Sequence, residues 1–254
     1  REYDETYDKL ILAPGAAPIR PPLSGVERPE VLTLRNLADM DRICSVLDRG
    51  VRQAVVVGAG FIGLEMIENL VHRGVDTTLV ELQDQLLPPL DREMTTPIRQ
   101  ALAEHHVSVR LSDSVTAIEE SPDGVTVVLQ SGTCIAAQLV ILGVGVRPES
   151  RLAVESGLDV GPRGGIRVDD TLQTSDPNIY AVGDAIETRD FRTSHPTQVP
   201  LAGPANRQGR LAADHIFGRP IKFRGTQATA IVGLFGRTAA TTGASEKVLL
   251  REGR

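Results

Sequence analysis

The chain has 254 residues and a formal net charge of −6, and no basic block interrupts this acidic balance, so nucleic acid is excluded as an expected partner. No apolar run approaches the roughly 18 residues that a membrane span needs. Two cysteines, Cys44 and Cys134, form no CxxC pair and predict no disulfide framework, so we expect a soluble cytoplasmic protein without membrane association.

The first predicted element is a strand over residues 7–13, which Pro14 and Gly15 end sharply. Residues 18–22 are proline-rich and predict a stiff, extended connector. A helix is then expected over residues 36–49, because apolar residues recur there at helical spacing: Leu37, Met40, Ile43 and Leu47.

Residues 53–81 have the pattern of a dinucleotide-binding βαβ unit. A short β-branched run, residues 54–57, indicates a buried strand. A G-x-G-x-x-G motif follows, then a helical pattern over residues 64–72, then a second strand over residues 77–80. The strand, the glycines, the helix and the second strand occur in the order that this unit requires.

Each part of this βαβ unit has a physical role. Gly58 permits a tight turn, Gly60 lets the backbone approach a pyrophosphate, and Gly63 allows the helix to pack closely on the strand. The N–H groups at the helix start would face the phosphates. Glu81 ends the second strand, where a carboxylate accepts hydrogen bonds from ribose hydroxyls. A 2′-phosphate would meet this negative charge, and the next two residues supply no arginine, so NADH is expected rather than NADPH.

Beyond Glu81 we expect a helix that Asp91 caps and that reaches about His105. Four short β-rich runs follow and predict an antiparallel meander covering one face of the parallel sheet: residues 107–111, 115–120, 125–129 and 134–137. Residues 139–142 are again a buried type of strand, and they end at a loop that contains Gly145.

The remainder contains short strands within residues 157–174 and a brief strand before Gly183 and Asp184. A helix is expected over residues 205–216, and another β-rich segment over residues 226–242.

Three blocks resemble the pyridine nucleotide–disulfide oxidoreductases, flavoproteins in which an NAD(P)H domain interrupts an FAD domain. The branch that looks most similar contains the CoA-disulfide reductases, NADH oxidases and NADH peroxidases. Residues 7–15 resemble the strand and turn that return the FAD domain toward its dinucleotide, residues 58–81 resemble the NADH fingerprint, and residues 178–184 resemble the second FAD motif. Residues 199–209 are similar to the helix entry beneath the flavin pyrimidine.

The resemblance implies an α/β fold, with a Rossmann-like NAD(H)-binding domain inserted in an incomplete FAD-binding domain of the same two-dinucleotide-binding flavoprotein fold. We expect FAD-domain segments at residues 1–35 and 153–222, the NAD(H)-binding domain at 36–152, and the start of a truncated C-terminal dimerisation domain at 223–254. The full-length parent would be a homodimer and this chain an internal fragment of it. No second glycine fingerprint precedes Tyr7, and neither cysteine matches the family's redox position.

On the NADH side, the resemblance implies that Phe61 gates the nicotinamide pocket and that Glu65, one helical turn later, contacts the nicotinamide carboxamide. Ile62 and Gly145 are expected to touch the cofactor as well. The alternatives are a core phenylalanine with a surface ion pair at Glu65, and a plain glycine–proline turn around Gly145.

On the FAD side, the implied cofactor-binding residues are Ala13, Pro14, Gly15, Gly183, Asp184, Pro200, Leu201 and Ala202. Asp184 would accept hydrogen bonds from the ribityl hydroxyls, although an aspartate at this point also suits a turn or a helix cap. The backbone N–H groups at Leu201 and Ala202 would face the flavin, where a positive helix end stabilises an anionic reduced ring. Pro14 departs from the threonine of many relatives. The five histidines show no ligand spacing, so no metal site is predicted.

The implied function is an FAD-dependent oxidoreductase that passes hydride from NADH to flavin and then to a small-molecule acceptor, which is a disulfide or persulfide, peroxide, or oxygen. A second hypothesis is a catalytically incomplete NAD(H)-binding fragment that lacks the redox cysteine and the first FAD motif. A third is a Rossmann enzyme for another ligand, such as a methyl donor, and the second FAD-like motif weighs against it.

Overall fold

A computed structural model describes residues 3–251 and 253 of the chain. The chain forms two compact units: a first unit from residues 1–17 and 146–230, and a second unit from residues 18–145 and 231–254. Residues 1, 2, 252 and 254, which belong to the expected terminal segments, lie outside the described residues. The domain divisions expected at 35/36, 152/153 and 222/223 stay predictions.

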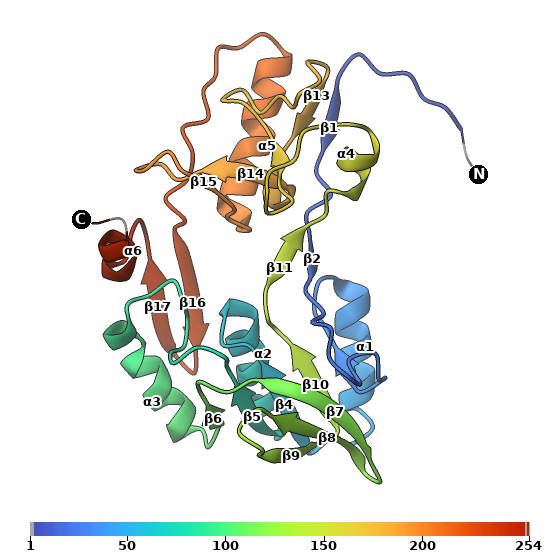
Figure 1. Ribbon diagram of the computed structural model, residues 1–254, viewed down its shortest axis with the longest axis vertical. Helices are drawn as coiled ribbons and strands as arrows, with labels where there is room; N and C mark the ends of the chain where they lie inside the picture. Colours follow the sequence, from blue (N-terminus) through green and yellow to red (C-terminus); the bar gives the residue numbers. More distant parts are fainter. Residues whose placement is uncertain (1–2, 252, 254) are drawn as a thin grey trace. The chain divides into compact units, whose positions relative to one another are not determined.

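The second unit is built on five parallel strands (Figure 1). Their order across the sheet is β3 (Val31–Leu32), β10 (Leu139–Leu142), β4 (Gln53–Val57), β5 (Asp76–Val80) and β6 (Ser108–Arg110). The last residue of β4, Val57, is paired with Val80 and with Leu142, the last residues of its two neighbours. Three strands therefore end level with one another at one edge of the sheet.

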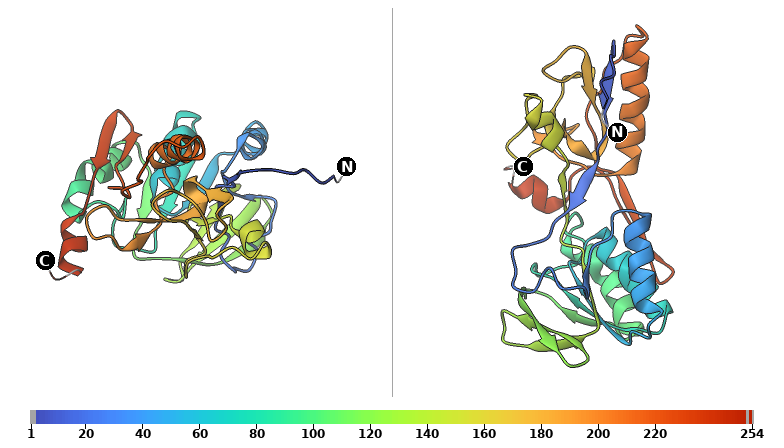
Figure 2. Two further views of the ribbon diagram at one scale, coloured as in Figure 1. Left: turned by 90° about the horizontal axis from the view of Figure 1, so that it is seen from above. Right: turned by 90° about the vertical axis from the view of Figure 1, so that its right-hand side faces the viewer.

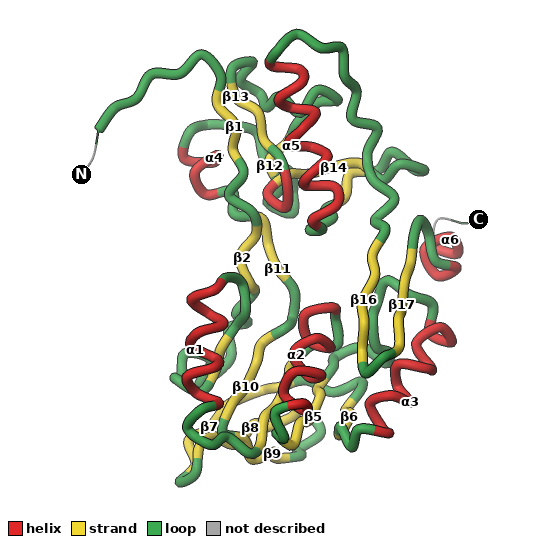
Figure 3. Tube along the Cα trace, turned by 180° about the vertical axis from the view of Figure 1, so that it is seen from behind, coloured by secondary structure: helices red, strands yellow, loops and turns green. Residues whose placement is uncertain are grey.

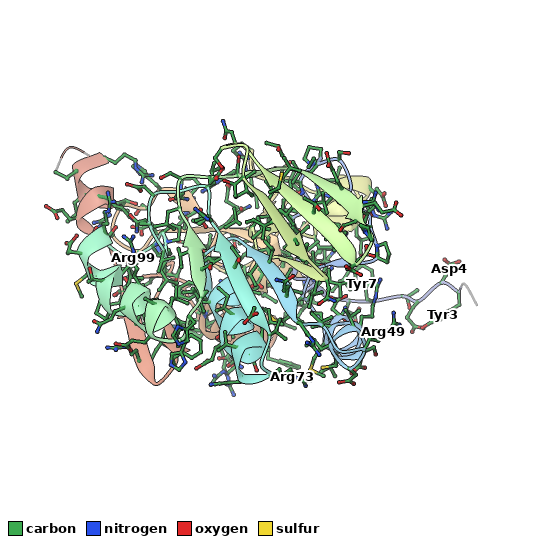
Figure 4. All side chains as sticks on the ribbon, turned by 90° about the horizontal axis from the view of Figure 1, so that it is seen from below. Tyr3, Asp4, Tyr7, Arg49, Arg73 and Arg99 are labelled. Carbon is green, nitrogen blue, oxygen red and sulfur yellow. The ribbon has the colours of Figure 1, made fainter. Side chains whose placement is uncertain are left out.

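Both faces of this sheet are covered, which is why its central strands are continuously apolar. Helices α1 (Leu37–Leu47), α2 (Phe61–His72) and α3 (Thr96–Glu104) lie on one face, and the antiparallel strands β7 (Val115–Ser121), β8 (Gly124–Leu129) and β9 (Cys134–Ala137) cover the other (Figures 2 and 4). Within β4, Ala54 and Val56 pack into the core on the helix side, and Val55 and Val57 into the core on the other side. Figure 4 also shows Arg49 and Arg73 at the C-terminal ends of α1 and α2, where a positive charge is favourable.

One sheet prediction was wrong, and one edge strand was not predicted. The run at residues 107–111 does not belong to the meander, because α3 returns the chain in the direction of β5 and β6 pairs parallel with it. Strand β3 was not predicted, since two residues carry no periodic pattern. It pairs with β10 at the other edge of the sheet.

Helix starts differ from the prediction where prolines stand. The helix expected from Asp91 begins as a 3-10 turn, η1 (Arg92–Thr95), and becomes α-helical only as Pro97 enters its first turn. Helix α5 (Ala202–Ile216) begins three residues before the expected start, because Pro204 in a first helical turn removes no hydrogen bond. The helix predicted over residues 36–49 is confirmed as α1, with Asn36 and Asp39 forming a reciprocal capping box.

The C-terminal residues of the second unit pack on its helices. Strands β16 (Ala230–Leu234) and β17 (Arg237–Thr241) pair, and Arg237 of β17 forms an ion pair with Glu104 of α3 at 2.7 Å. Asp91 does not cap its own helix as expected. Its carboxylate accepts hydrogen bonds from the N–H groups of Glu246 and Lys247, at the start of α6 (Glu246–Arg251).

The first unit is assembled from short strands and one long helix (Figure 3). Strand β1 (Leu10–Leu12) pairs parallel with β13 (Ile179–Ala181), and α5 packs beside them through Ala212. The other elements are β2 (Ala16–Pro18) paired with β11 (Val146–Pro148), α4 (Arg151–Glu155), η2 (Gly183–Ala185), and a sheet of β12 (Ile166–Arg167), β14 (Ile186–Arg189) and β15 (Pro196–Thr197). In the part of the chain that the structure describes, no helix has the length and apolar character of a membrane span.

Candidate functional site

The glycine loop lies where β4 ends and α2 begins, and its shape requires two of its glycines. Gly58 has φ +104°, and a Cβ there would lie 2.4 Å from the carbonyl oxygen of Gly143. A Cβ on Gly63 would lie 1.9 Å from the carbonyl oxygen of Gly58. These contacts confirm the predicted tight turn at Gly58 and the predicted close packing of helix on strand at Gly63.

Gly60 has a different character. Its φ is −79°, which any residue adopts, and an added Cβ would meet no atom within 4 Å. It is the N-terminal cap residue of α2, whose start has no side-chain cap and no acidic residue in the first turn among the described residues. The backbone is therefore open at the point where the helix presents its positive end, which suits an anion.

Glu81 is buried at the end of β5 and is held against the glycine loop. Its two carboxylate oxygens accept hydrogen bonds from the N–H groups of Ala59, at 2.6 Å, and Gln83, at 2.8 Å. Only 8% of its surface is exposed. Because a carboxylate has about four acceptor positions, this arrangement fixes the side chain and still leaves positions for a ligand.

Gly58, Gly60 and Glu81 border one cavity of about 520 Å³. Gly145, with φ +108°, lines the same cavity from the loop after β10, as expected of a strand-end residue. Asp113 also lines it, and the sequence analysis did not single this residue out. The complete lining consists of Ile19, Pro21, Leu23, Val57, Gly58, Gly60, Val80, Glu81, Leu82, Gln83, Pro88, Asp113, Ser114, Val115, Gly143, Val144 and Gly145.

The residues expected around the nicotinamide lie on α2, outside that lining. Phe61 is half-buried and packs against the core on the helix side of the sheet. Ile62 and Glu65 are exposed. The structure places Phe61 and Glu65 one turn apart on one helix, and their expected contacts with a cofactor stay predictions.

In the first unit, the residues expected to contact FAD gather at the ends of β1 and β13. The N–H of Val182 donates to the carbonyl of Leu12, so Ala13, Pro14 and Gly15 leave one strand beside the point where Gly183 and Asp184 leave the other. The N–H of Gly183 donates to the side-chain oxygen of buried Gln208, on α5, at 2.7 Å. Burial raises the pKa of Asp184.

The third expected FAD segment is the start of α5. Pro200 precedes the helix, Leu201 is its N-terminal cap residue, and Ala202 is its first residue. The described first turn carries no acidic residue and no side-chain cap. A Cβ on Gly183 would lie 3.7 Å from the Cβ of Ala205, one turn into this helix. The helix start therefore lies close to the step formed by Gly183 and Asp184.

Neither cysteine lies among these residues. Cys44 is on α1 and Cys134, on β9, is exposed; both are free thiols. The described residues contain no group of three or more histidine, cysteine or acidic side chains arranged to hold a metal ion.

A parallel sheet with a glycine loop, an open helix start and an acidic residue at the next strand end defines a dinucleotide-binding α/β protein. The family model for pyridine nucleotide-disulphide oxidoreductases matches residues 1–209, and the chain belongs to this family. This confirms the resemblance seen in the sequence.

Individual relatives agree with this family. The coenzyme A disulfide reductase of Staphylococcus haemolyticus is 34% identical over 244 residues, which cover 95% of this chain and 54% of that protein. The crystal structure of reduced CoADR-RHD from Bacillus anthracis superposes with a TM-score of 0.95 at 47% identity and covers 99% of this chain and 45% of its own. The structure of the NAD-dependent persulfide reductase from A. fulgidus superposes with a TM-score of 0.94 at 38% identity, and the match covers 97% of this chain and 46% of that one. The expected fold class is thus confirmed, and the chain spans about half the length of these relatives.

Proposed function

We propose that this chain supplies the NADH site and part of the FAD site of an FAD-dependent oxidoreductase, which passes hydride from NADH to flavin and on to a small-molecule acceptor. The acceptor is a disulfide or persulfide, peroxide, or oxygen. One observation carries the proposal: a glycine loop, an uncapped helix start and a buried glutamate border a single cavity in a chain of this family.

The proposed NADH site fits the cavity in size and in chemistry. Its volume of about 520 Å³ lies in the range of cofactor and small-ligand sites. The open backbone at Gly60 would admit the pyrophosphate, and the first N–H groups of α2 would donate to it. Glu81, already held by the loop, would accept hydrogen bonds from the adenosine ribose hydroxyls.

The proposed FAD residues also fit. Asp184 is partly shielded from water, so its carboxylate has lost some of its hydration. A hydrogen bond from a ribityl hydroxyl would compensate for that loss. The N–H groups at Leu201 and Ala202 would face the pyrimidine edge of the flavin, and Pro200 would set the direction in which the chain enters the helix. Residues 13–15 and Gly183 would flank the dinucleotide. When bound, FAD supplies the redox chemistry, accepting hydride and delivering electrons to the acceptor. We propose that Phe61 and Glu65 position the nicotinamide.

The test is a visible spectrum of the purified chain, followed by addition of NADH. A yellow protein that bleaches supports the proposed oxidoreductase. A colourless protein that binds NADH supports the second hypothesis, a catalytically incomplete NAD(H)-binding chain. A protein that binds neither FAD nor NADH contradicts both.

We further propose that the full-length protein is a homodimer, as the resemblance implies, and that it acts in the cytoplasm. Two free cysteines without a disulfide suit a reducing compartment. Sedimentation of a full-length protein that contains this chain would test the dimer.

A further inference from the structure

A second carboxylate lies in the proposed NADH cavity. Asp113 follows β6, at the same edge of the sheet as Glu81, and only 9% of its surface is exposed. The N–H of Asp113 donates to the carbonyl of Glu81 at 3.1 Å, so the two residues are direct neighbours across adjacent strand ends. The N–H of Ser112 donates to the carbonyl of Gln83, which extends this pairing by one further bond.

The side chain of Asp113 is fixed in this position. Its Oδ1 accepts hydrogen bonds from the N–H groups of Ser114, at 2.9 Å, and Ser131, at 3.2 Å. The side chain of Ser131 contributes most to lowering the pKa of Asp113, the two backbone N–H groups and Arg110 act in the same direction, and burial opposes them. The carboxylate is therefore ionised at neutral pH, and its remaining acceptor positions are free for a ligand or for water.

The charges that border the cavity are all of one sign. Among the described residues of its lining, Glu81 and Asp113 are acidic and none is basic. Arg110, whose charge acts on Asp113, is not part of the lining. The adenosine end of the cavity is thus bordered by two anions on neighbouring strand ends.

We propose that Asp113 is a second determinant of the choice between NADH and NADPH. Together, the carboxylates of Glu81 and Asp113 would accept an adenosine ribose with free hydroxyls and repel a 2′-phosphate. This inference rests on the proposed NADH site. A 2′-phosphate carries up to two negative charges and would face both carboxylates in a cavity partly shielded from water, where charges interact more strongly than in bulk solvent. Glu81 reads the hydroxyls by hydrogen bonding, and Asp113 adds repulsion without needing to touch the ribose.

The test uses the full chain and two small probes, 5′-AMP and adenosine 2′,5′-bisphosphate (2′,5′-ADP), which differ only in the 2′-phosphate and need no flavin. Their affinities are measured by calorimetry for wild type, Asp113→Asn and Glu81→Gln. Asparagine retains an oxygen that can accept from Ser114 and Ser131 but removes the charge, and thermal melting verifies that the variant is folded. Asp123→Asn is the matched control, because Asp123 is an exposed carboxylate in the turn between β7 and β8, outside the cavity lining.

We expect wild type to bind 5′-AMP more tightly than 2′,5′-ADP. In Asp113→Asn the ratio of the two affinities should fall about three- to tenfold, because 2′,5′-ADP binds more tightly while the affinity for 5′-AMP changes less than about twofold. The preference of wild type should also decline with added salt, and that of Asp113→Asn should decline less, because screening acts on charge. Asp123→Asn should behave as wild type.

A folded Asp113→Asn protein with the wild-type preference and the wild-type salt dependence would overturn the inference while leaving the NADH site intact. A wild-type chain that binds neither 5′-AMP nor NADH would overturn the proposed site itself, and this inference with it. The two failures are thus distinguishable in one set of titrations.

Discussion

At the scale of single residues, Asp184 and Asp190 of the first unit have pKa values shifted in opposite directions. Burial raises the pKa of Asp184. Burial acts in the same direction on Asp190, but hydrogen bonds from the N–H and hydroxyl of Thr193 and from the N–H of Arg192 together outweigh it and lower the pKa of Asp190. The folded state therefore disfavours ionised Asp184 and favours ionised Asp190.

This contrast predicts opposite effects of removing the two charges. Above its folded pKa, ionised Asp184 costs stability. The cost decreases as the pH falls below that raised pKa and is gone below the usual pKa of aspartate, so Asp184→Asn should raise the melting temperature at pH 7 and have no such effect in acid. Ionised Asp190 contributes stability above the usual pKa of aspartate, and the contribution is lost as the pH falls through its lowered pKa, so Asp190→Asn should lower the melting temperature at pH 7. Melting curves from pH 3 to pH 8 measure both; shifts of the same sign at pH 7 would contradict the account.

A gain in stability at Asp184 is also informative about function. A carboxylate retained in a place where folding disfavours its charge is typical of a site that a ligand completes. In the proposed site this ligand is the ribityl chain of FAD, so the more stable Asp184→Asn variant should retain FAD less well than wild type.

At the scale of elements, the hairpin of β16 and β17 is held to the helices α2 and α3 by alternating burial. Val232 and Leu234 of β16 lie in the core on the helix side of the sheet, while Ile231, which precedes Val232, is 71% exposed. At the hairpin tip, Phe235 stacks on His105 with ring centroids 3.8 Å apart, and its N–H donates to Glu68 at 2.6 Å. A strand with one buried face thus attaches the C-terminal residues to the dinucleotide-binding sheet.

Two truncations on this strand should therefore differ in effect. Leu234→Ala removes a fully buried side chain and should cost about 2–5 kcal/mol of unfolding free energy. Ile231→Ala, a change of similar size on the exposed face, should stay within about 0.5 kcal/mol. Urea denaturation measures both, and equal losses would show that the hairpin is not packed as described.

At the scale of the whole molecule, much of the architecture could be predicted because it depends on local patterns. The β-branched runs at residues 54–57 and 139–142, the helical spacing in α1 and α2, and the glycine motif each report on a few neighbouring residues. The structure confirms these elements. Gly58 has to be glycine because it lies against the backbone of Gly143, and Gly63 because it lies against the backbone of Gly58.

What could not be predicted depends on residues far apart in the sequence. Asp91 was expected to cap the helix that follows it, but its carboxylate binds the start of α6. Asp113 has no motif around it and becomes part of the cavity only because β6 joins the sheet beside β5. The same pairing explains why the predicted meander had one strand too many.

Gly60 offers the most direct measurement of the central claim, that the open backbone at the head of α2 receives a pyrophosphate. Its φ of −79° and the empty space around an added Cβ make alanine acceptable to the fold, so Gly60→Ala should change the unfolding free energy by no more than about 1 kcal/mol. The added methyl group would occupy the space of the ligand. Calorimetric titration of NADH into wild type and Gly60→Ala should show a loss of about tenfold or more in affinity. A folded Gly60→Ala protein that binds NADH as tightly as wild type would contradict the account.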